Sequence, residues 1–213
     1  YVPYLMPGFG LAKAAAAVFD ADPSAEGLIL VKHGIFTFGA DAREAYERMI
    51  ALVTLAEERL ASRRKPAFTG AKLPACPARV ADVAPIIRGA CSLPEEKIEG
   101  GWKRFILDFR GSDAVMNFVN GEEVARYGQD GVVTPDHNIR IKNRPLVVAA
   151  PADGDLGGFK NAVRDAVAAY GEYYKGYFDR NNARVGGIKT MLDPVPRVVL
   201  VPGVGLFGLG RSK

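Results

Sequence analysis

Two stretches of the chain share one pattern: LILVKHGIFTFG at residues 28–39 and VLVPGVGLFGLG at residues 199–210. In each, a short apolar run ends in a glycine-containing turn and a second apolar run follows, which is typical of two buried strands joined by a tight turn. With the final glycines aligned, the matching positions after the turn are Gly34 with Gly205, Ile35 with Leu206, and Phe36 with Phe207. We therefore predict one strand–turn–strand unit that is used twice.

The second copy also contains a G-x-G-x-x-G pattern at Gly203, Gly205 and Gly208. A dinucleotide fingerprint requires more: a helix that begins at these glycines and an acidic residue about 20 positions further on. The residues up to Lys213 supply neither, and Pro202 interrupts the strand-to-turn step. We interpret these glycines as turn residues and assign no cofactor-binding residue.

Helical and strand patterns alternate along the rest of the chain. Residues 41–64 carry apolar side chains on one face at helical spacing, and Asp41 with Glu44 forms a capping pair at the start. Residues 157–182 predict a long helix with tyrosines along one side, and residues 79–91 fit a helix or a strand. This order predicts the α/β class, as a layered sheet with helices.

Composition limits the class of protein. The chain has 213 residues, is 48% hydrophobic and carries a formal net charge of +4. Its positive residues are scattered and no apolar stretch approaches the roughly 20 residues that cross a bilayer, so we expect no nucleic-acid partner and no membrane partner. The only two cysteines, Cys76 and Cys91, do not form a metal-binding C-x-x-C pair. They fit a reducing, cytoplasmic environment, and a single disulfide between them is the alternative.

Two histidines are candidates for chemistry. His33 follows an apolar strand and precedes a glycine, so it could ligate a metal or tie down the turn by hydrogen bonds. His137 lies in TPDH, where Asp136 and His137 could cap a turn after Pro135, or could join His33 in a shared site. Lys13, near the start of a predicted helix, could contact phosphate or serve helix initiation alone.

One segment, residues 3–53, resembles the C-terminal half of a class II aldolase/adducin domain. The specific part is LVKHGIFTFG followed by AREAYERM. The likeness is closest to the aldolase portion of bifunctional rhamnulose-1-phosphate aldolase/short-chain alcohol dehydrogenase proteins. It continues through VTPDHNIRIKNRPLVV and DPVPRVVLVPGVGLFGLGRSK, which resemble the segment that connects the two activities.

The resemblance implies a divalent metal, usually zinc, held by three histidines, two from an upstream H-x-H and one from the H-G after a strand. His33 matches this last ligand. The sequence contains no H-x-H and no residue that we can match to the family's acid/base glutamate, so the catalytic residues stay unassigned. The implied reaction is cleavage of a deoxyketose 1-phosphate, such as rhamnulose 1-phosphate, to dihydroxyacetone phosphate and lactaldehyde, which an NAD-dependent dehydrogenase domain would then oxidise.

These observations predict three parts: the C-terminal part of an aldolase-like domain at 1–65, a linker at 66–78, and a second, degenerate module at 79–213. We expect the chain to be an internal piece of a longer cytoplasmic polypeptide, inactive by itself and without tightly bound zinc. Family members form tetramers, so we also expect a homo-oligomer. The alternative is an adducin-like interaction module without catalysis, because a fold persists when its site is lost.

Overall fold

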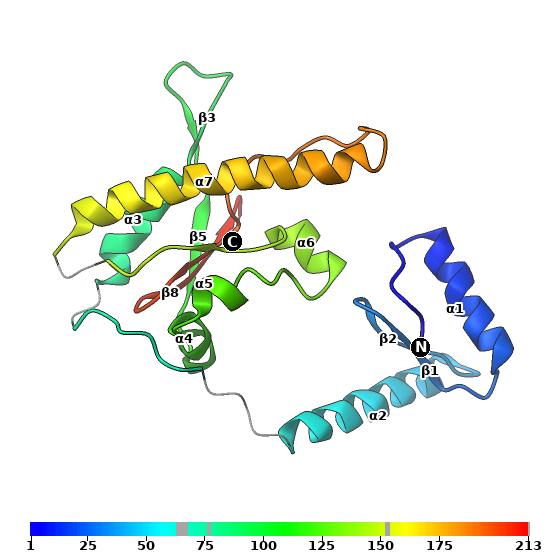
Figure 1. Ribbon diagram of the computed structural model, residues 1–213. Coiled ribbons are helices and arrows are strands. Elements are labelled where there is room, and N and C mark those ends of the chain that lie inside the picture. Colours follow the sequence, from blue (N-terminus) through cyan, green and yellow to red (C-terminus); the bar gives the residue numbers. More distant parts are fainter. Residues whose placement is uncertain (63–67, 76–77, 152–153, 213) are drawn as a thin grey trace. The chain divides into compact units, whose positions relative to one another are not determined.

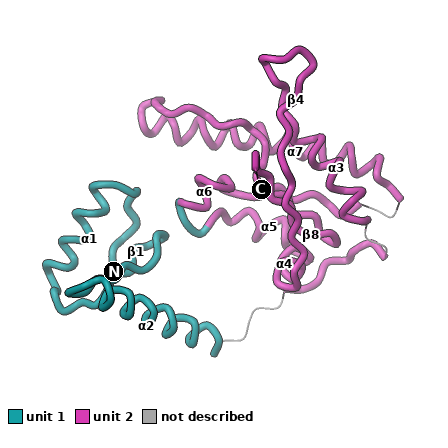
Figure 2. The backbone as a smooth tube through the Cα atoms, turned by 180° about the vertical axis from the view of Figure 1, so that it is seen from behind, with its two compact units in different colours: residues 1–66, 133–135 teal, residues 67–132, 136–213 magenta. Residues whose placement is uncertain are grey.

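A computed structural model of the chain describes residues 1–62, 68–75, 78–151 and 154–212. It divides into two compact units, unit 1 with residues 1–66 and 133–135, and unit 2 with residues 67–132 and 136–213 (Figure 2). Of the predicted linker, residues 66, 67, 76 and 77 lie outside the described residues. None of the helices in the described ranges combines the length and apolar character that a membrane crossing requires.

Unit 1 is a two-stranded hairpin with a helix on each side of it in the sequence. Its elements are α1 (Phe9–Ala21), β1 (Gly27–Leu30), β2 (Gly34–Thr37) and α2 (Ala42–Ala61). The predicted cap of α2 is confirmed, because the Asp41 carboxylate accepts a hydrogen bond from the Glu44 amide at 2.8 Å. The helix that precedes the hairpin in the sequence, α1, contributes apolar side chains to a small core around Leu28 and Leu30.

Unit 2 is built on a four-stranded sheet of order β5-β8-β7-β6, in which only β6 and β7 run parallel. The long helix α7 and the helix α3 pack together and share the main core with the sheet (Figure 1). The elements of unit 2 are α3 (Val80–Ala90), β3 (Leu93–Pro94), β4 (Trp102–Lys103), β5 (Ile106–Arg110), α4 (Asp113–Val119), α5 (Val124–Tyr127), α6 (Pro135–Ile141), β6 (Leu146–Val147), α7 (Leu156–Ala183), β7 (Val198–Val201) and β8 (Gly205–Gly210).

The two predicted copies form the same hairpin. With Gly39 aligned on Gly210, the strand pairs coincide residue for residue: Leu28↔Phe36 with Val199↔Phe207, Ile29↔Ile35 with Leu200↔Leu206, and Leu30↔Gly34 with Val201↔Gly205. The turns agree as well, because the His33 amide donates to Leu30 and the Val204 amide donates to Val201, each at 3.0 Å. The α/β class and the repeated strand–turn–strand unit are therefore confirmed.

The repeat extends beyond the hairpin that the sequence revealed. Val2 pairs in parallel with Leu30, and its amide donates to the Ile29 carbonyl at 2.9 Å. In unit 2 the Val148 amide donates to the equivalent carbonyl, that of Leu200, at 3.0 Å. Each copy thus has a segment that pairs in parallel with the hairpin's first strand, then a helix, then the hairpin.

One prediction at the level of a single element needs correction. Residues 134–137 do not form an isolated turn, because Pro135 begins the helix α6, the position where proline's missing amide proton is not needed. Residues 79–91, for which helix and strand were both possible, form the helix α3 with Pro85 inside it.

Candidate functional site

His33 lies in the turn that joins β1 to β2. The backbone enters the left-handed region at Lys32, with a φ of 64°, and reaches 126° at Gly34. The turn is closed by the hydrogen bond from the His33 amide to Leu30. This backbone places the imidazole immediately after the strand, where the sequence predicted it.

The imidazole interacts with two residues of the segment that precedes α1. Its Nε2 lies 2.7 Å from the Leu5 carbonyl oxygen, and the ring of Tyr4 stacks on it with centroids 5.4 Å apart and an interplanar angle of 11°. A carbonyl oxygen only accepts hydrogen bonds, so Nε2 carries the proton. In the neutral ring the lone pair is then on Nδ1, the arrangement of a histidine that can bind a cation through Nδ1.

The position of Tyr4 and Leu5 follows from the pairing of Val2 with β1. The Val31 amide donates to the Val2 carbonyl at 3.0 Å, so the chain is held beside the end of β1 just before it reaches Leu5. Val2 itself is fully buried. The tautomer and orientation of His33 are therefore fixed by the pairing of Val2 with β1, and no sequence motif predicts this pairing.

The described residues do not complete a metal site around this imidazole. Within those ranges, no group of three or more His, Cys, Asp or Glu side chains is placed to hold a metal ion. His137 lies in the first turn of α6, in the other unit. A catalytic zinc takes three protein ligands, so His33 alone does not fit a zinc centre.

The structure also places the other candidates from the sequence, Lys13 and the three glycines of the G-x-G-x-x-G pattern. Lys13 lies on α1 with its Nζ 5.0 Å from the centre of the Phe9 ring. Gly203 is in the turn before β8, while Gly205 and Gly208 are within that strand. Since a strand follows this turn, the glycines do not begin a helix of the kind that a dinucleotide fingerprint requires.

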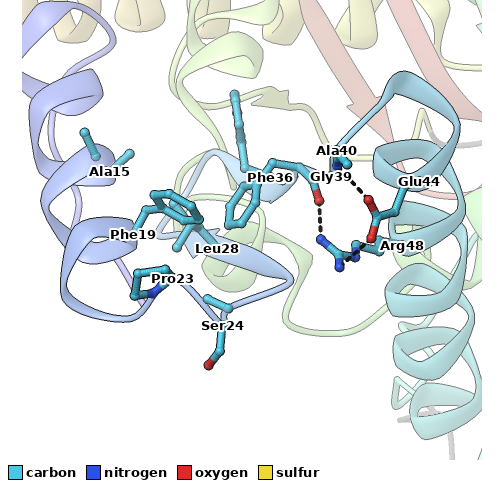
Figure 3. Close-up of a pocket in the computed structure, with 13 residues that line it drawn as sticks. Ala15, Phe19, Pro23, Ser24, Leu28, Phe36, Gly39, Ala40, Glu44 and Arg48 are labelled. Carbon is cyan, nitrogen blue, oxygen red and sulfur yellow. Dashed lines mark hydrogen bonds and ion pairs between the residues drawn. The ribbon is translucent and has the colours of Figure 1, made fainter.

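An apolar pocket of about 800 Å³ opens in unit 1 between α1, the hairpin and the start of α2 (Figure 3). Phe19, Leu28 and Phe36 form part of its lining. At its rim, Arg48 forms an ion pair with Glu44 at 2.7 Å and donates to the Phe38 carbonyl at 2.7 Å (Figure 3). The guanidinium is already neutralised, so the pocket is suited to apolar side chains rather than to a phosphate.

A buried lysine in unit 2 was missed from the sequence. Lys142 is 2% exposed, donates to the carbonyls of Asp193 and Val195, and lies with its Nζ 3.8 Å from the centre of the Tyr174 ring. Burial lowers its pKa to about 8, against the opposing effect of the Asp193 carboxylate. Asp193 is also bound by Arg197, so the group is a closed network that joins distant segments.

The fold and the His33 turn together define an α/β protein with a duplicated strand–helix–hairpin unit and an H-G turn in its first copy. The chain belongs to the class II aldolase family. The family model described as "Aldolase class II, second domain" matches residues 78–213, and the model of the "Class II Aldolase and Adducin N-terminal domain" matches residues 1–60.

A relative from Bacillus subtilis (strain 168), named "Uncharacterized oxidoreductase YuxG", is 31% identical over 220 residues. The alignment covers 100% of this chain and 30% of that protein, so the chain spans about a third of the relative's length. No solved structure matches the chain.

Proposed function

We propose that this chain is part of a metal-dependent aldolase that cleaves a deoxyketose 1-phosphate, with rhamnulose 1-phosphate as the substrate, to dihydroxyacetone phosphate and lactaldehyde. The observation that carries the proposal is the His33 turn, in which the family's H-G ligand position is held with Nε2 on the Leu5 carbonyl and the lone pair on Nδ1. The proposal assigns His33 the role of one metal ligand, and residues outside these 213 the roles of the others and of the acid/base.

The same polypeptide would carry an NAD-dependent short-chain dehydrogenase that oxidises the lactaldehyde. Support comes from the Bacillus subtilis relative, which is named an oxidoreductase and is much longer than this chain. The chain itself would contribute no NAD contact. Self-association of the gene product is part of the proposal.

The test uses the complete gene product and two histidine variants. His33→Ala should lower the release of dihydroxyacetone phosphate from rhamnulose 1-phosphate by more than about 100-fold, which is the upper end of the loss expected for an outer-shell partner of a metal ligand. Bound zinc, measured by elemental analysis, should fall with it. His137→Ala is the matched control and should retain both. Full activity and full zinc content in His33→Ala would remove His33 from the site.

A non-catalytic, adducin-like module is the second candidate, favoured by the single imidazole that the described residues place at the turn. It predicts a folded gene product that binds no zinc and releases no dihydroxyacetone phosphate. Oxidation of lactaldehyde with NAD separates the two halves of the proposal, because His33→Ala should leave that activity unchanged.

A further inference from the structure

The two hairpins have the same backbone but differ in how deeply their strands are buried. Phe36 is 60% exposed, whereas its counterpart Phe207 is 0% exposed. On the opposite face of the hairpin, Ile29 is 57% exposed and its counterpart Leu200 is 1% exposed. Large apolar side chains on both faces of the hairpin are thus exposed in unit 1, whereas their counterparts in unit 2 are buried.

Unit 2 shows which elements provide this cover. Strand β5 pairs antiparallel with β8 and places Phe109 opposite Phe207, with ring centroids 5.4 Å apart. Helix α3 adds Val83 and Ile87 to the buried cluster that contains Phe207. On the other face, side chains of α4 and α5 form a second buried cluster with Leu200, which includes Val119 and Val124.

Unit 1 has no equivalent of these elements among its described residues. Its sheet consists of β1 and β2 alone, so the outer edge of β2 is unpaired by any described strand. The unpaired N–H and C=O groups of a strand edge are a template for pairing with another strand. The pocket lined by Phe19, Leu28 and Phe36 lies on the face that α3 would cover in unit 2.

We propose that the outer edge of β2 accepts an antiparallel strand equivalent to β5, and that helices equivalent to α3, α4 and α5 accompany it. The alignment of the repeats fixes the register: this strand would pair with residues 35–39 and place an apolar or aromatic side chain opposite Phe36. In unit 2 the covering elements, residues 80–127, precede the first strand of the repeat, β6. By the same order, the covering segment of unit 1 precedes Val2 on the same polypeptide.

The register also identifies the backbone groups that bind the added strand. In unit 2 the Leu209 amide donates to Arg197 on the β7 side at 2.8 Å. Because backbone groups alternate along an antiparallel strand, Leu206 and Gly208 then face β5. Their counterparts in β2, Ile35 and Thr37, should have amides that are open to water in the isolated chain and hydrogen-bonded when the segment is present.

Residue-resolved hydrogen exchange on the 213-residue chain and on the complete gene product tests this proposal. The Ile35 and Thr37 amides should exchange at least tenfold more slowly in the gene product, and Phe36→Asp should remove that protection there while leaving their exchange in the 213-residue chain unchanged. The amides of Leu206 and Gly208 should be protected in both proteins and serve as the internal control.

Two results would overturn the proposal. Equal exchange of Ile35 and Thr37 in both proteins would show that no strand is added at this edge. Protection in the 213-residue chain that rises with protein concentration would show that a second copy occupies the edge instead. Neither readout depends on aldolase activity, so the proposed function can fail while this inference stands.

Discussion

Phe36 and Phe207 occupy equivalent positions in the two hairpins, yet their replacement by alanine should have very different effects on the 213-residue chain. Phe207 is fully buried, and truncation of a core phenylalanine costs about 3–5 kcal/mol. Phe36 is 60% exposed. Since complete burial of such a side chain contributes up to about 3 kcal/mol, the buried two fifths of Phe36 contributes about 1 kcal/mol.

The two units need not unfold together, so the assay must follow each of them separately. Hydrogen exchange measured by mass spectrometry, with peptides that contain β1 and β7 and with increasing urea, gives an opening free energy for each hairpin. Phe207→Ala should lower the value for β7 by about 3–5 kcal/mol. Phe36→Ala should lower the value for β1 by about 1 kcal/mol.

Equal losses in the two variants would refute this reasoning. A loss of about 3 kcal/mol or more for Phe36→Ala would mean that Phe36 is as buried in solution as a core residue. Repeating the measurement at several protein concentrations would show whether a second copy buries it, because a loss that arises from association depends on concentration.

Three further predictions, which use four substitutions, follow from the structure. Burial lowers the pKa of Lys142 to about 8, against 10.5 when it is unperturbed. Between these two pH values the unfolded chain binds more protons than the folded chain, so the free energy of unfolding should rise by about 2–3 kcal/mol from pH 8 to 10.5. Lys142→Met should abolish this rise, which urea titrations at several pH values would measure. Gly34 and Gly205 have φ values of 126° and 142°, where an alanine costs about 1–3 kcal/mol of backbone strain. Gly34→Ala, with open space around it, should cost only this strain. Gly205→Ala would also place a Cβ 2.7 Å from the Arg110 carbonyl oxygen and should cost more than about 3 kcal/mol, both measured by calorimetry. Lys32→Gly should raise the thermal midpoint of unit 1, because glycine adopts the observed φ of 64° without strain; an unchanged or lower midpoint would contradict this.

The elements predicted correctly from the sequence are those set by residues that lie close together in the chain. The capping pair Asp41 and Glu44 is three residues apart, and the hairpin pattern lies within 12 residues, so both could be read from the sequence. Helix α6 was missed because seven residues that begin with a proline resemble a turn as much as a helix.

The surroundings of the candidate site depend on contacts between distant segments. His33 is bound by Leu5, 28 residues away, through a backbone carbonyl that any residue type would supply. The Lys142 network joins residues 51 and 53 positions apart, again through carbonyl oxygens. A pattern of side chains cannot reveal partners that are backbone atoms, so the sequence predicted the imidazole but not what holds it.

The two copies differ in backbone strain at one position of the turn. Lys32 and its counterpart Gly203 both have a left-handed backbone, with φ values of 64° and 79°. A lysine in this conformation costs roughly 1–2 kcal/mol that a glycine does not, and such strain persists where surrounding contacts impose it and concentrates at functional sites. In the second copy the Gly203 amide donates to the Asn120 side chain and Val204 is buried, so that turn is part of the packing. The copy that keeps the strained residue is the copy with the imidazole, which is the arrangement expected if the first turn is retained for its chemistry and the second for its fold.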